Sequence, residues 1–197
     1  FSGAGKGTLM KELVSRYDNY ALSISATTRS PREGEVDGRE YFFRTKEEFE
    51  QMIADEALIE HACYVGNYYG TPRAYVEEQL ALGRDVILEI EIQGALQIKK
   101  RFPDTLLLFV STPDAETLKN RLIGRGTESL DVVEKRLSRA SEEAEGIENY
   151  DYFIINDDLD TCVTQVHQII QGEHSRVSRN LELINTIKKD ISKFQKG

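Results

Sequence analysis

The sequence predicts an α/β fold in which helices cover both faces of a parallel sheet. Three apolar runs, at residues 85–92, 106–110 and 152–155, are typical of strands that are buried on both faces. Segments with helical spacing alternate with these runs, which is the pattern of strand–helix–strand units. A glycine-rich segment at residues 1–8 precedes the first helix, and such sheets bind ligands where strands end and helices begin.

Length and composition describe one globular domain, or one domain with insertions. The chain has 197 residues, of which 40% are hydrophobic and 30% charged. It contains no run of about 18 apolar residues that could cross a membrane. The net charge of −9 and the pI of about 5.0 argue against nucleic acid as a main partner. Cys63 and Cys162 form no paired pattern, so we expect buried, reduced thiols and a cytoplasmic protein.

Residues 1–8, with the sequence FSGAGKGT, have the features of a phosphate-binding loop. Its three glycines let several backbone N–H groups point at one anion, and Lys6 has the spacing that reaches the β- and γ-phosphates of a nucleotide. Gly7 stands where a serine or threonine usually binds Mg²⁺, so Thr8 carries the nearest hydroxyl. A glycine-rich turn with an incidental lysine is the alternative. Such a loop normally follows a buried strand, so we expect an apolar strand just upstream of Phe1.

In the first half of the chain, short strands and turns interrupt the strand–helix alternation. The expected elements are strands at 21–25, 39–43, 57–65 and 68–70, a helix at 46–54 with Thr45 as its N-cap, and a helix from Pro72 to near Gly83. We interpret residues 25–82 as an inserted small α+β subdomain. The core would then consist of residues 1–24 and 83–197.

In the second half of the chain, helices alternate with the apolar runs. The expected helices are residues 93–101, 115–123 and 130–145, and a helical segment from Leu159 onward. An apolar stripe from Val177 to Phe194 is expected to pack against the core, with a dimer interface as the alternative. We interpret the polar, glycine-containing break at residues 124–130 as a second, smaller insertion.

Four motifs give the chain a resemblance to guanylate kinases over essentially its full length. They are SISATTRSPREGE at residues 23–35, GNYYGT at 66–71, IEIQG at 90–94 and GRGT at 124–127. The resemblance implies a P-loop NTPase fold, which is a three-layer αβα arrangement with a parallel sheet, an inserted nucleoside-monophosphate-binding subdomain and a short lid. It also implies the reaction ATP + GMP ⇌ ADP + GDP with Mg²⁺, in purine nucleotide metabolism.

The resemblance implies a GMP-phosphate site made of two arginines and two tyrosines. The phosphate would lie on Arg29, Arg32 and the hydroxyls of Tyr41 and Tyr69. Two arginines three residues apart in a tight loop also suit one phosphate chemically, because each guanidinium can donate two parallel hydrogen bonds. A solvated loop is the alternative on residue type alone.

The resemblance also implies how guanine is read. Glu60 matches the family's guanine-binding carboxylate, and Ser25 and Thr71 match the hydroxyls beside it. One carboxylate pairs with the N1–H and N2 donors of guanine, and adenine lacks that donor pair. By residue type alone, Glu60 is a surface glutamate on an edge strand. Glu91 would lie near GMP, at a position where the family usually has aspartate.

The remaining assignments concern ATP and the transferring phosphoryl group. The expected ATP-binding residues are Gly3, Ala4, Gly5, Lys6, Gly7, Thr8 and Asn156. The expected catalytic residues are Lys6, Arg121, Arg125 and Arg136, because cations around the transferring group stabilise the charge on its oxygens. A helix cap at Asn156 and a surface charge at Arg121 are the alternatives. Mg²⁺ would be held mainly by phosphates and water, assisted at most by Thr8 or Glu89.

Two other functions are compatible with the same fold. A guanylate-kinase-like interaction module binds phosphorylated peptides and typically lacks the loop lysine and the lid arginines, which this chain has. A kinase for another nucleoside monophosphate is opposed by the guanine-reading residues. We therefore predict an enzyme, monomeric or homodimeric, whose partners are GMP and ATP and not nucleic acid or a membrane.

Overall fold

The structure is a computed structural model, and it describes residues 1–64, 66–124 and 130–196. Its α-helices are α1 (Lys6–Arg16), α2 (Lys46–Ala54), α3 (Arg73–Ala81), α4 (Ile92–Arg101), α5 (Ala115–Gly124), α6 (Leu130–Ala144), α7 (Leu159–His174) and α8 (Leu181–Ser192). Its strands are β1 (Tyr20–Leu22), β2 (Ala26–Thr27), β3 (Phe42–Phe43), β4 (Leu58–Tyr64), β5 (Asn67–Pro72), β6 (Asp85–Ile87), β7 (Leu108–Ser111) and β8 (Tyr152–Ile155). The predicted mixed α/β class is confirmed.

The strands form three small sheets. β1 pairs in parallel with β6, and β7 pairs in parallel with β8. Strands β3, β2, β5 and β4 form a separate four-stranded sheet in that order. The expected single parallel sheet is therefore present as two parallel pairs, because no described strand bridges β6 and β7. A cleft of about 500 Å³, lined mainly by residues 85–92 and 104–110, lies between the pairs. The strand expected upstream of Phe1 stays a prediction.

Two of the apolar runs are less buried than predicted. In β8 only Ile154 is buried, whereas Phe153 and Ile155 are 50% and 48% exposed. β6 ends at Ile87 and is half-buried, although a buried strand was predicted over residues 85–92. The reason is that Ile154 faces the core formed by α1 and α7 whereas Phe153 and Ile155 lie on the opposite face of β8, and that β6 faces the cleft on the side away from β1.

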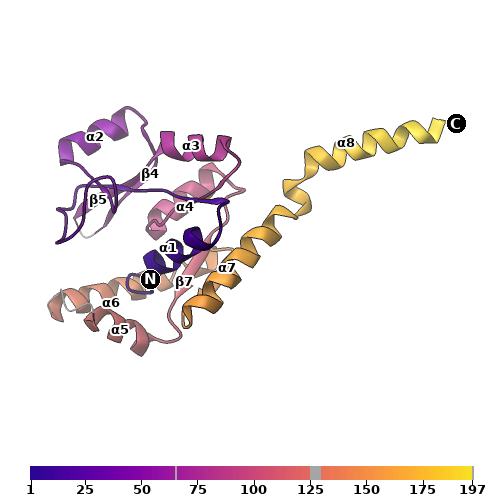
Figure 1. The fold of residues 1–197 in the computed structure, drawn as a ribbon. Helices are drawn as coiled ribbons and strands as arrows, with labels where there is room; N and C mark the ends of the chain where they lie inside the picture. The colour runs from indigo at the N-terminus through magenta and orange to yellow at the C-terminus, as the bar shows by residue number, and fades with distance from the viewer. Residues whose placement is uncertain (65, 125–129, 197) are drawn as a thin grey trace.

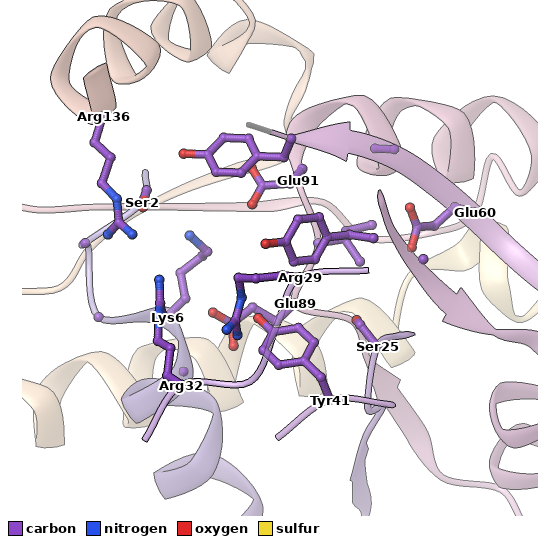
Figure 2. A pocket seen from close by; sticks show the side chains of 18 residues that line it. Ser2, Lys6, Ser25, Arg29, Arg32, Tyr41, Glu60, Glu89, Glu91 and Arg136 are labelled. Carbon is purple, nitrogen blue, oxygen red and sulfur yellow. The ribbon is translucent and has the colours of Figure 1, made fainter. Parts of the chain in front are cut away.

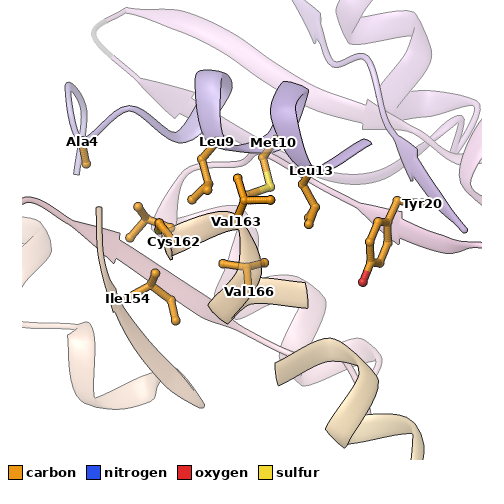
Figure 3. Packing of buried hydrophobic residues seen from close by; sticks show 10 residues of the cluster. Ala4, Leu9, Met10, Leu13, Tyr20, Ile154, Cys162, Val163 and Val166 are labelled. Carbon is orange, nitrogen blue, oxygen red and sulfur yellow. The ribbon is translucent and has the colours of Figure 1, made fainter. Parts of the chain in front are cut away.

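The main core lies between α1 and α7. Leu9 and Leu13 of α1 pack with Val163 and Val166 of α7, and these four side chains are fully buried (Figure 3). Their spacing of three or four residues puts each pair on one face of its helix. Ile154 of β8 extends this core to the sheet. Packing here fixes the start of α1, and with it the glycine-rich loop.

The four-stranded sheet and α2 have a small core of their own. Phe49 of α2 packs with Ala26 and Leu58 of the four-stranded sheet. α2 begins where predicted, because the Thr45 hydroxyl accepts a hydrogen bond from the Glu48 amide, and the Glu48 carboxylate accepts one from the Thr45 amide. Figure 1 shows this region on one side of the glycine-rich loop and helices α5 and α6 on the other.

The C-terminal segment differs from the prediction. Helix α8 extends away from the rest of the chain (Figure 1), and none of its residues is buried. The prediction that its apolar stripe packs against the core is therefore wrong, because the turn after α7 directs the helix outward. Cys162 is buried as predicted, but Cys63 is exposed. Among the described residues, no helix is long and apolar enough to cross a membrane.

Candidate active site

A polar cleft gathers residues from five separate parts of the sequence. Figure 2 shows Glu60 and Ser25 toward one end, Ser2, Lys6 and Arg136 toward the other, and Arg29 between them. The lining residues are Ser2, Gly3, Gly5, Lys6, Gly7, Ser25, Arg29, Arg32, Tyr41, Glu60, Ala62, Tyr64, Tyr69, Gly70, Glu89, Ile90, Glu91 and Arg136. Most of the residues that the sequence singled out therefore share one cleft.

The glycine-rich loop forms one wall of the cleft and runs into α1. Gly3 and Gly5 have φ angles of 92° and 85°, in the left-handed region that favours glycine. Gly5 is the N-cap of α1, so the unpaired N–H groups of that helix face the cleft. The Lys6 ammonium donates to the Phe1 carbonyl at 2.9 Å, across the loop. This geometry provides an anion site with a cation beside it.

Two predicted site residues support the loop from behind. The amide Nδ2 of Asn156, a buried residue, donates to the Ala4 carbonyl at 2.8 Å. Arg121 Nη1 donates to the Asn156 carbonyl at 2.9 Å. Gly5 is required at this contact, because a Cβ at position 5 would lie 2.6 Å from Asn156 Nδ2. Neither residue lines the cleft; both hold the shape of its glycine-rich wall.

The middle of the cleft carries the two arginines of the 29–35 loop. The Arg29 guanidinium lies over the Tyr41 ring, 5.2 Å from its centroid, and the Tyr41 and Tyr69 rings are 6.1 Å apart. Burial, followed by the nearby Glu89 carboxylate, raises the pKa of Tyr41 to about 12. Tyr41 is therefore a neutral hydrogen-bond donor at neutral pH. Arginine and tyrosine donors converge here on a space that suits a phosphate group.

Glu60 lies at the other end of the cleft and is 5% exposed. Its Oε1 accepts a hydrogen bond of 2.7 Å from the hydroxyl of Thr71, which is fully buried and does not itself line the cleft. Burial raises the pKa of Glu60 to about 7, against the hydrogen bonds from Thr71. Ser25 lies on the cleft wall nearby (Figure 2). A buried carboxylate beside a hydroxyl can recognise a ligand edge with two adjacent donors.

Two further carboxylates follow β6. Glu89 approaches the glycine-rich loop so closely that a Cβ at Gly7 would lie 3.3 Å from its Oε2. Burial raises the pKa of Glu91, while the Lys6 ammonium opposes this shift. Among the described residues, no three His, Cys, Asp or Glu side chains cluster as metal ligands. Thr8 is exposed and lies outside the cleft lining, so Glu89 is the better placed of the two expected Mg²⁺ partners.

The lid side contributes Arg136, which lines the cleft from α6. Arg125, the third expected catalytic arginine, lies outside the described residues, as do residues 126–129 of the expected lid. The described site thus has a buried carboxylate at one end, arginine and tyrosine donors in the middle and a glycine-rich loop at the other end of one cleft (Figure 2).

Comparison with known proteins identifies the family. The family model described as guanylate kinase matches residues 1–173. The chain belongs to the guanylate kinase family. It is 53% identical to the guanylate kinase of Bacillus cereus (strain ZK / E33L), over 90% of this chain and 87% of that protein. It is 49% identical to the guanylate kinase of Lactococcus lactis subsp. lactis (strain IL1403), over 92% of this chain and 88% of that protein.

The structural comparison agrees. The crystal structure of guanylate kinase from Anaplasma phagocytophilum matches with a TM-score of 0.75 and 30% sequence identity, and the match covers 88% of this chain and 84% of that chain. The predicted resemblance is therefore confirmed at the level of the family. Helix α8 lies beyond the stretch that the guanylate kinase family model matches.

Sequence reasoning missed some residues of this guanylate kinase cleft. Tyr64 and Ser2 line it, and burial raises the pKa of the Tyr64 hydroxyl. Ser2 belongs to the loop that was recognised, so its position was a usable signal. Tyr64 lies at the end of β4, four residues after Glu60, and the two-residue period of a strand gives both the same face.

Proposed function

We propose that the protein transfers the γ-phosphoryl group of ATP to GMP and releases ADP and GDP. The observation that carries this proposal is the order of groups in one cleft. A buried carboxylate, a pair of arginines and a phosphate-binding loop follow one another, in the order that guanine, its phosphate and ATP would require. Membership of the guanylate kinase family supports the same reaction.

In this proposal, GMP binds with its base at Glu60. The ionised carboxylate accepts hydrogen bonds from N1–H and N2 of guanine, while Thr71 holds one of its oxygens and Ser25 lies beside the base. Adenine would present the N1 acceptor and a C2–H group there, which leaves the buried carboxylate unpaired and costs about 1–3 kcal/mol or more. Glu91, the N-cap residue of α4, would face the nucleotide.

The GMP phosphate would bind Arg29 and Arg32, with the hydroxyls of Tyr41 and Tyr69 as additional donors. Two guanidinium groups and two neutral hydroxyls match the oxygens of a phosphate monoester. A phosphate monoester has its second pKa near 6, so the attacking oxygen is already ionised at neutral pH. The reaction therefore requires no general base, and the role of the site is to position and neutralise charge.

ATP would bind at the glycine-rich loop, through backbone N–H groups of residues 3–8. Lys6, which donates to the Phe1 carbonyl in the structure, would turn its ammonium to the phosphates. Asn156 is expected to act on ATP through the loop that it supports. Arg125 and Arg136 would stabilise the transferring phosphoryl group, and Arg121, which donates to the Asn156 carbonyl in the structure, would turn its guanidinium toward that group.

Mg²⁺ is part of this proposal. The carboxylate of Glu89 beside Gly7 is the kind of oxygen ligand, direct or through water, that the ion prefers. Bound Mg²⁺ would supply positive charge that neutralises the phosphates.

We also propose the domain organisation stated above. Residues 25–82 would be the GMP-binding subdomain, residues 124–130 the lid, and the remaining residues the core. The subdomain and the lid would close on the two nucleotides and exclude water, so that ATP is not hydrolysed. Cytoplasmic localisation is part of the same proposal, because the substrates are metabolites.

The test is ATP-dependent phosphoryl transfer to GMP, AMP, UMP and CMP, with Mg²⁺. We expect GDP to form with a strong preference for GMP. Turnover that favours another acceptor would indicate a different nucleoside monophosphate kinase. Absence of turnover with all four, while GMP still binds, would indicate a binding module.

A further inference from the structure

Glu35 makes an ion pair that the reaction scheme does not use. Both of its carboxylate oxygens accept hydrogen bonds from Arg29: Oε2 from Nη1 at 2.9 Å, and Oε1 from Nη2 at 3.0 Å. The two side chains are only 16% and 15% exposed, so this is not an ordinary surface pair. Burial alone would raise the pKa of Glu35, but the contacts with Arg29 and Arg32 lower it.

Glu35 also organises the backbone of the same loop. Its Oε2 accepts a hydrogen bond of 2.7 Å from the Arg32 amide, and its own amide donates to the Arg32 carbonyl at 3.1 Å. Gly34 takes the positive φ angle of 82° that this turn requires. One carboxylate therefore holds the side chain of the first arginine and the backbone of the second.

One edge of the Arg29 guanidinium takes no part in the ion pair with Glu35. Both Nη1 donors are used, one by Glu35 and one by the Ser30 carbonyl at 2.7 Å. Glu35 takes one N–H of Nη2, and Nε takes no part in the ion pair. Nε and Nη2 form the side edge of a guanidinium, which can donate two parallel hydrogen bonds to a phosphate. Arg29 lines the cleft, whereas Glu35 is not among the lining residues.

We propose that Glu35 is a positioning residue that fixes Arg29 and Arg32 before GMP binds, so that the side edge of Arg29 faces the GMP phosphate. This inference rests on the proposed function, because it assumes that the phosphate binds at these arginines. An arginine that is ordered in advance loses less conformational entropy when its ligand arrives. Glu35 acts through the arginines and does not touch the substrate.

Simple electrostatics predicts the opposite effect. A negative charge near the phosphate repels it, so neutralising Glu35 would strengthen GMP binding if charge alone mattered. A carboxylate that competed with the phosphate for Arg29 would give the same result. Loss of positioning weakens GMP binding instead. The sign of the change therefore separates the proposal from both alternatives.

The experiment is calorimetric titration of the full chain and its variants with GMP and with guanosine, which has the base but no phosphate. For Glu35→Gln we expect the Kd for GMP to rise about five- to tenfold, which is the cost of ordering one or two side chains on binding. The Kd for guanosine should change less than about twofold, since Glu60 is untouched. In turnover, the KM for GMP should rise while the KM for ATP does not.

Two further variants complete the test. Glu33→Gln removes the same charge from an exposed position of the same loop and should leave both Kd values unchanged. Glu35→Asp keeps the charge but places the carboxylate one methylene short, so we expect it to weaken GMP binding as Glu35→Gln does. It also serves as the test variant if Glu35→Gln does not fold.

Three results would overturn the proposal. They are GMP binding that is unchanged or tighter in Glu35→Gln, an equal loss of affinity for GMP and for guanosine in that variant, and a Glu35→Asp variant that binds GMP as tightly as the wild type. A different result would count against the proposed function itself: wild-type protein that binds GMP no more tightly than guanosine has no phosphate site in this cleft.

Discussion

Glu60 combines two properties that oppose each other. The side chain is buried, which raises its pKa to about 7, and yet its proposed task requires the ionised form. Its folded-state pKa lies above the ordinary value of 4.5, so the folded protein binds more protons than the unfolded chain between these two values. The free energy of unfolding therefore falls as the pH rises from about 4.5 to 7, and the ligand-free protein remains less stable at higher pH.

Glu60→Gln should stabilise the ligand-free protein at pH 8. The substitution removes the buried charge and keeps the side-chain volume, so we expect a gain of roughly 2–4 kcal/mol at pH 8 that disappears by pH 4. Urea unfolding at several pH values measures it. Glu78→Gln, at an exposed position, is the matched control. A gain that is the same at both pH values would show that ionisation of Glu60 is not its cause.

The hydrogen bond from Asn156 to the glycine-rich loop leads to a second prediction. Asn156→Ala leaves the Ala4 carbonyl without its 2.8 Å donor, so the glycine-rich loop loses a support. We expect the KM for ATP to rise several-fold with little change in the KM for GMP, and a stability loss of about 1–3 kcal/mol. Asp157→Ala, at the exposed neighbouring position, should change neither quantity. Equal effects on the two substrates would argue against a role through the loop.

Residue identities could be predicted from the sequence where a local motif defines them. The Thr45 cap is an example, since all its partners lie within four residues. The burial of Glu60 depends on a distant residue. A Cβ at Gly94 in α4 would lie 2.2 Å from Glu60 Oε2, so the carboxylate fits inward only because position 94 is glycine. The role of Asn156 likewise depends on Ala4, 152 residues away. Contacts of this kind have no local signal.

At the scale of elements, helix periodicity was a better guide than apolar runs. The predicted helices over 46–54 and 115–123 agree with α2 and α5 within one residue. The apolar runs predicted strands, but not their burial, because burial of a strand depends on which neighbours pair with it and cover it. In β8, Ile154 faces the core, whereas Phe153 and Ile155 lie on the opposite face of the strand and remain exposed.

The burial of helix α8 could likewise not be predicted from its apolar residues, and its exposure leads to a prediction about stability. Ile187 is 47% exposed, whereas Leu13 of α1 is fully buried. Ile187→Ala should therefore lower the free energy of unfolding by less than about 0.5 kcal/mol, and Leu13→Ala by about 2–5 kcal/mol. Denaturant unfolding at low protein concentration compares them. A loss above about 1 kcal/mol for Ile187→Ala would mean that another surface covers α8 in solution.

At the scale of the whole molecule, the cleft lies between two separately packed parts of the chain. The four-stranded sheet with α2 has its own apolar core, and the glycine-rich loop is held by the core between α1 and α7. These two cores are separate clusters of buried side chains, so we expect one to move relative to the other. This organisation suits a site that encloses two nucleotides.

Closure of the cleft should be measurable. We expect the distance between labels on the exposed faces of α2 and α6 to shorten when GMP and a non-hydrolysable ATP analogue bind together. Fluorescence energy transfer in the full chain, with labels at introduced cysteines and with Cys63 replaced, follows this distance. Guanosine alone, which lacks the phosphate, is the control and should give a smaller change. Identical distances with and without both nucleotides would contradict closure.

Guanine recognition by Glu60 is tested most directly by discrimination between GMP and IMP, which lacks the N2 donor. With Glu60 reading both donors, the wild-type kcat/KM should favour GMP by about 10- to 100-fold, the cost of one unpaired buried oxygen. In Glu60→Gln most of this preference should disappear. Equal preference in the two proteins would show that Glu60 does not read guanine, and no preference in the wild type would contradict a guanine-specific site in this cleft.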